Sequence, residues 1–125
     1  MVQVETSQLT GECNSWREKL RQYRDEFSKD KVKLQEAVSQ PLSKDQLQQV
    51  EHLHNQFHIQ LINIHDLKHA IKAHEQKMGY EMNVHRKLQN ETLAEHENIL
   101  DQFQTLDSTL VELREEFDTF LSRTS

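Results

Sequence analysis

Histidine is the residue type of this chain with the clearest capacity for chemistry. Eight histidines occur among 125 residues, and six of them fall within one stretch of 23 positions. In that stretch His54 and His58 are four residues apart, His65 follows His58 by seven, and His69 follows His65 by four. On a helix these spacings place all four side chains on one side. Because two imidazoles at i and i+4 can chelate a divalent metal ion, these four residues are candidate metal ligands.

The surrounding sequence does not complete a known metal motif. The zinc-protease pair requires Glu directly after its first histidine, whereas Asn55 follows His54 and an aspartate follows His65. A carboxylate-bridged di-iron bundle requires Glu-x-x-His twice, and this spacing occurs once, from Glu51 to His54. We therefore expect no metal and no cofactor, and keep the four histidines as secondary candidates.

Proton sensing is a second interpretation of the histidines, because histidine changes its charge between pH 5 and 8. Protonating all eight would move the formal net charge from −6 to +2. His54, His85 and His96 fall on the apolar stripe described below, where burial opposes protonation. Mild acid is therefore expected to loosen the bundle or a dimer of it.

Composition argues against most other functions. The chain has two glycines, it lacks a Gly-rich phosphate loop and a nucleophile elbow, and no arrangement of its Ser, His and Asp residues indicates a catalytic triad, so we expect no enzyme. The net charge of −6, with no separate block of Lys and Arg, argues against nucleic acid. No apolar run approaches the ~20 residues of a membrane span, and the N-terminus lacks signal-peptide features, so the expected location is cytoplasmic, with no membrane partner.

Long helices must carry these residues. A hydrophobic share of 34% with one proline favours elongated helices that bury a stripe, in a single domain over residues 1–125. The first helix is expected over 7–39, with Cys13 as a small buried hydrophobe, because Pro41 cannot continue a helix. After a turn at 40–43, Ser43 and Gln46 form a capping-box pattern for a second helix over 43–78 or longer. A third helix is expected over 91–123.

An apolar stripe with alternating steps of three and four residues runs through the second and third helices. This spacing predicts a coiled-coil seam that packs against another helix. Its apolar members, the expected interaction residues, are Phe57, Leu61, Ile64, Ile71, Met78, Ile99, Phe103, Leu106, Leu110, Leu113, Phe117 and Phe120. Polar residues occupy the same stripe at other positions, and four of them are expected to set its register: His85, Gln89, Thr92 and His96. The long side chains of Lys68 and Glu75 are expected to extend to the edge of the stripe, where they could also help to select a partner or register.

Residues 79–92 leave two arrangements open. In one, a turn near Gly79 or Asn90 makes an antiparallel three-helix bundle. In the other, residues 43–123 form one helix about 120 Å long, and an antiparallel dimer completes the packing. The polar seam residues in this segment favour the turn, and the unbroken heptad phase favours the continuous helix.

In both arrangements the packing unit is an all-α, elongated antiparallel three-helix coiled coil. On length, periodicity and the position of Trp16, its shape is similar to a spectrin-type repeat. We expect a non-enzymatic interaction, scaffold or adaptor protein that binds itself, as a homodimer, or another helical protein. The alternative is a histidine-rich helical protein that responds to metal or pH.

Overall fold

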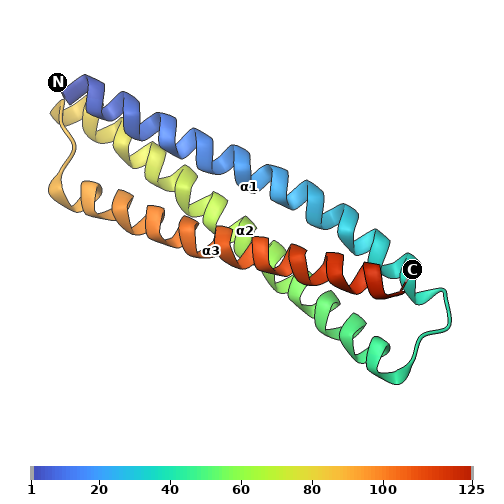
Figure 1. Ribbon diagram of the computed structural model, residues 1–125. Helices are drawn as coiled ribbons and strands as arrows, with labels where there is room; N and C mark the ends of the chain where they lie inside the picture. Colours follow the sequence, from blue (N-terminus) through green and yellow to red (C-terminus); the bar gives the residue numbers. More distant parts are fainter. Residues whose placement is uncertain (1, 125) are drawn as a thin grey trace.

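The computed structural model describes residues 2–124, with side chains from residue 6 onward, and confirms the all-α three-helix bundle. The helices are α1 (Val2–Val38), α2 (Lys44–His85) and α3 (Asn90–Thr124). Figure 1 shows them side by side in an elongated rod, with the α2–α3 turn beside the start of α1 and the α1–α2 turn beside the end of α3. Therefore α1 and α3 run in the same direction, and α2 runs against both.

The turn between α1 and α2 is set by its own sequence. Ser43 adopts an extended backbone conformation, and its hydroxyl accepts a hydrogen bond from the backbone N–H of Gln46 at 3.1 Å. The Gln46 side chain in turn accepts the Ser43 backbone N–H at 2.8 Å. This reciprocal capping box, expected from the sequence, satisfies two of the donors that the start of a helix leaves unpaired.

The chain also turns between α2 and α3, so it forms a bundle by itself and not through a helix running continuously over 43–123. Arg86 ends α2 in the left-handed conformation, with φ 59° and ψ 17°, and donates its backbone N–H to the Met82 carbonyl at 3.1 Å. Gly79, one of the two positions at which the sequence suggests a turn, lies inside α2.

The buried carboxylate of Glu81 stabilises this second turn through two hydrogen bonds. It accepts the Gln89 backbone N–H at 2.9 Å and the Thr92 hydroxyl at 2.6 Å. The hydrogen bond from Gln89 is the main reason that the pKa of Glu81 lies below its usual range. Glu81 therefore supplies, from α2, the acceptor that the first turn of α3 requires.

The apolar core lies along the axis of the rod. In α3 the inward stripe is the one expected, from Thr92 through Phe120. In α2 it is different: Phe57, Ile64, Ile71 and Met78 are buried, but Leu61 is only partly buried. The second inward column of α2 is Leu53, Gln60, Leu67, His74 and Glu81.

The seam assigned to α2 was therefore wrong in one of its two columns. In this column Leu61, Lys68 and Glu75 flank the core and His54 is exposed. His85, the last residue of α2 in the other column, is also exposed. Glu75 illustrates the reason, because it pairs with Arg17 on α1, with Oε1 2.7 Å from Nε. This column lies at the border with α1, since α2 must divide its inward surface between two neighbouring helices.

Candidate functional site

Three side chains that can ligate a metal meet inside the rod, in the half that contains the α2–α3 turn. They are Cys13 of α1, His74 of α2 and His96 of α3, which are 0%, 0% and 4% exposed. Each occupies an inward position of its helix, and the antiparallel arrangement brings the three positions to the same level. A buried polar group requires a partner, so the contacts of this cluster decide what it can do.

The two imidazoles contact each other and a carboxylate each. Nε2 of His74 lies 3.0 Å from Nδ1 of His96. The outer nitrogens are turned to glutamates, with His74 Nδ1 3.2 Å from Glu95 and His96 Nε2 2.8 Å from Glu12. Lys77 approaches the second oxygen of Glu95 at 3.3 Å. The result is a continuous polar chain that crosses the core from α1 to α2.

The thiol of Cys13 completes the cluster. Its Sγ lies 4.0 Å from Nδ1 of His96, and the three donor atoms of Cys13, His74 and His96 all lie within 4.8 Å of one another. Burial, followed by the nearby charges of Glu75 and Glu12, raises the pKa of the thiol to about 12. Burial also lowers the pKa of His74, against the opposing effect of Glu95. Without a further positive charge, both groups therefore favour their neutral forms.

Aromatic side chains close one side of the cluster. The Trp16 ring lies 4.9 Å from the His96 ring between centroids, at 36°, and 6.0 Å from the Phe103 ring. Trp16 is itself 6% exposed. The imidazole of His96 is thus held in position by packing as well as by hydrogen bonds.

The four histidines considered from their spacing lie elsewhere. His54, His58, His65 and His69 are all exposed on α2. The rings of His65 and His69 stack with centroids 6.1 Å apart, and no further ligand from the described residues joins them. The structure instead assembles ligands from three helices, of which the sequence singled out only His96 as a seam residue and Cys13 as a buried hydrophobe.

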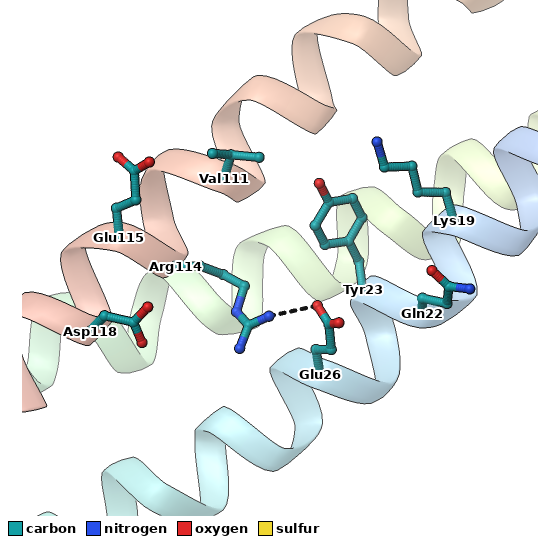
Figure 2. Close-up of a pocket in the computed structure, with 8 residues that line it drawn as sticks. All are labelled: Lys19, Gln22, Tyr23, Glu26, Val111, Arg114, Glu115 and Asp118. Atoms are coloured by element: carbon teal, nitrogen blue, oxygen red, sulfur yellow. Dashed lines mark hydrogen bonds and ion pairs between the residues drawn. The ribbon is translucent and has the colours of Figure 1, made fainter.

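A groove between α1 and α3 is the second feature that could hold a ligand. It has a volume of about 430 Å³ and is lined by charged residues from both helices (Figure 2). Arg114 reaches across it to Glu26 at 2.7 Å, and Lys19 lies 3.2 Å from Asp107. Tyr23 donates its hydroxyl proton to Asp107 at 2.6 Å. Both cations that line the groove, Arg114 and Lys19, already have acidic partners on the opposite helix. These ion pairs link α1 to α3.

Arg114 also faces Asp30, which takes a core position of α1 and is 2% exposed. Its Oδ2 lies 3.2 Å from Nε of Arg114, a pairing by charge without hydrogen-bond geometry. Burial raises the pKa of Asp30, and Arg114 and then Lys33 oppose that rise.

Known proteins give no further guide to this site. None of the protein-family models, curated proteins or solved structures that were compared matches the chain. Among the described residues, no helix has the length and apolar character that a membrane crossing requires.

Proposed function

We propose that this protein is a non-enzymatic helical interaction module that self-associates through the outer face of α2. The observation that carries the proposal is the distribution of charge. Residues 52–71 contain two charged residues, whereas 17–36 contain twelve and 101–120 contain seven. One of the two in α2, Lys68, is partly buried beside α1, which leaves Asp66 as the charged residue that this segment exposes.

The same segment carries exposed apolar side chains. Ile59 and Ile62 are 45% and 47% exposed and lie one helical turn apart, among exposed histidines and asparagines. Protein interfaces are distinguished from the remaining surface mainly by depletion of charge at their centre. A low-charge face about 30 Å long therefore supports docking of another helical surface.

The low charge of this face lets a second copy dock although the two whole chains carry charge of the same sign. Two chains of net charge −6 repel each other, and the strongest acidic segment is α3, where residues 91–123 hold nine acidic and two basic residues. The outer face of α2 offers contact without opposing carboxylate clusters. The proposed partner is thus a second copy, and a different helical protein is the alternative outcome.

Sedimentation equilibrium over a range of concentrations tests this proposal. The mass is expected to rise with concentration from 14.9 kDa toward twice that value. The double variant Ile59→Glu, Ile62→Glu should remain at the single-chain mass with unchanged helicity. Val32→Glu is the matched control, because Val32 is an exposed valine on the highly charged α1 and is 53% exposed. A wild-type chain that stays monomeric throughout, or a Val32 variant that dissociates equally, would contradict the proposal.

A further inference from the structure

We propose that Cys13, His74 and His96 bind one borderline-soft transition-metal ion, of the class of Zn²⁺, with one ligand from each helix. This site is independent of the outer face of α2 and of the self-association proposed above. It lies inside the rod, about three helical turns from the start of α1 and from the end of α2.

The protons of the two imidazoles give the first argument. A carboxylate accepts hydrogen bonds, so Glu95 requires an N–H at Nδ1 of His74, and Glu12 requires one at Nε2 of His96. A neutral imidazole carries one N–H. The inner nitrogens, Nε2 of His74 and Nδ1 of His96, are then both lone pairs, and they face each other at 3.0 Å. Two facing lone pairs repel unless a positive charge lies between them.

The positions of the donor atoms give the second argument. Zn–N and Zn–S bonds of about 2.0–2.1 Å and 2.3 Å place tetrahedral ligand atoms about 3.3 Å apart for two nitrogens and about 3.6 Å for nitrogen and sulfur. The observed separations are 3.0 Å between the nitrogens and 4.0 Å from Nδ1 of His96 to Sγ of Cys13, and the third pair, His74 and Cys13, lies within 4.8 Å. Rotation of the side chains, mainly of Cys13, would therefore bring the three donors onto one ion. One coordination position would remain for water or another small ligand.

The carboxylates give the third argument. A histidine that ligates a metal usually donates its other N–H to a carboxylate or carbonyl, which fixes the orientation of the ring and raises the basicity of the ligating nitrogen. Glu95 already makes this contact with His74, and Glu12 makes it with His96. The surface histidines His65 and His69 instead stack their rings on each other.

The donor set decides the class of ion. One thiolate and two imidazoles suit Zn²⁺, Co²⁺ or copper, whereas Ca²⁺ and Mg²⁺ prefer oxygen ligands. On binding, the Cys13 thiol would release its proton to the solvent, and the sulfur would form the bond to the metal. The resulting charge of +1 on the ion and thiolate lies beside the carboxylates of Glu12 and Glu95, which offset it. Because the ligands come from α1, α2 and α3, the ion would also hold the three helices together at this end.

Titration of the chelator-treated, tag-free protein with Zn²⁺ and with Co²⁺ tests the site. Calorimetry should give one Zn²⁺ per chain. The Co²⁺ form should show the near-ultraviolet charge-transfer band of a thiolate ligand and the visible bands of a tetrahedral ion. Cys13→Ser should lose the charge-transfer band, and Glu12→Gln should weaken Zn²⁺ binding about 10–100-fold, as expected for a partner of a ligating histidine.

Matched variants separate this site from the surface histidines. The double variant His58→Ala, His65→Ala removes two exposed imidazoles and should bind Zn²⁺ like the wild type. Circular dichroism of each metal-free variant checks that the bundle is intact, and Glu12→Gln, at a partly exposed position, provides the test if Cys13→Ser does not fold. A wild-type Co²⁺ spectrum without a thiolate band overturns the proposal. The proposal is also overturned if only the double variant His58→Ala, His65→Ala abolishes Zn²⁺ binding. In that case a proton shared between His74 and His96, and not a metal ion, would account for the contact of their inner nitrogens.

Discussion

Replacing Asp30 with leucine should stabilise the bundle at neutral pH. Asp30 interrupts the apolar stripe of α1 between Phe27 and Leu34, and all three are at most 2% exposed. The pKa of Asp30 is raised because burial outweighs the attraction of Arg114. The ionised carboxylate is therefore less favourable in the fold than in water. Removing it does not strand Arg114, which keeps Glu26 at 2.7 Å and is 34% exposed.

The size of the effect follows from two opposing contributions. Replacing a buried ion pair with apolar residues is typically neutral or stabilising by up to about 4 kcal/mol, a range that already includes burial of the new side chain. Imperfect packing of the leucine opposes this gain by about 1 kcal/mol. We expect a net increase of about 1–3 kcal/mol in the free energy of unfolding, where each kcal/mol raises the Tm of a chain of this size by about 3–5 °C.

Urea unfolding followed by circular dichroism at pH 7 and pH 3 measures this change. A group with a raised pKa contributes more stability when protonated, and that contribution is lost as the pH rises through the folded-state pKa. The advantage of Asp30→Leu should therefore be larger at pH 7 than at pH 3. Asp25→Leu, at an exposed position of the same helix, should change the stability by less than about 0.5 kcal/mol. If Asp30→Leu destabilises a fully helical bundle at pH 7, the pair with Arg114 is net stabilising and the reasoning is refuted.

Four further predictions concern single positions and can be measured by the same unfolding experiments. Gly79→Ala should stabilise by up to about 1 kcal/mol, because Gly79 lies inside α2 and an added Cβ meets nothing within 4 Å; a loss of stability would contradict this. Arg86→Gly should stabilise by a few tenths to about 1 kcal/mol, because the left-handed conformation of Arg86 suits glycine; no gain would show that the Arg86 side chain makes a compensating contact. Phe57→Ala should destabilise by about 3–5 kcal/mol, since this ring is fully buried against two others; a loss below 1 kcal/mol would mean the core closes over the gap. The pKa of Glu81 is lowered from 4.5, so the stability that its ionised carboxylate contributes is complete above pH 4.5 and is lost as the pH falls through the folded-state pKa. The difference in unfolding free energy between the wild type and Glu81→Gln should therefore shrink in acid. A difference that does not depend on pH would refute the role of the ionised form.

The helices and the α1–α2 turn could be predicted because their signals are local. Pro41 stops one helix, and Ser43 with Gln46 starts the next, within a few residues of sequence. The inward stripe of α3 was also predictable, because apolar residues fill every position of it from Ile99 to Phe120.

The inward face of α2 could not be predicted from periodicity alone. The column beginning at Leu53 and the column containing Leu61 both mix apolar with polar residues, so the pattern gives them similar weight. Which column is buried depends on where α1 and α3 pack, and that is tertiary information. The apparent unbroken phase across residues 79–92 ran through both columns of the stripe, but His85 and Gln89 are exposed and Thr92 is buried on the other side of the turn.

The Cys13, His74 and His96 cluster required the same missing information. Cys13 is 61 positions before His74, and His96 is 22 positions after it, so no linear spacing connects them. The signal that could have found them is the combination of a ligating side chain at an inward heptad position in each of three helices. That combination becomes visible only when the second turn is placed at residues 86–89.

The two ends of the rod differ in the character of their interiors, and this difference sets the order in which they should open. One end is filled by aromatic rings, with Phe57 5.5 Å from Phe27 and 5.1 Å from Phe117. The other buries His74, Glu81, Thr92 and His96, whose polar atoms regain hydrogen bonds in water. Local opening should therefore begin at the polar end, with fast amide exchange there and slow exchange around the aromatic rings. A thiol reagent would then reach Cys13 while the aromatic end of the same molecule remains folded.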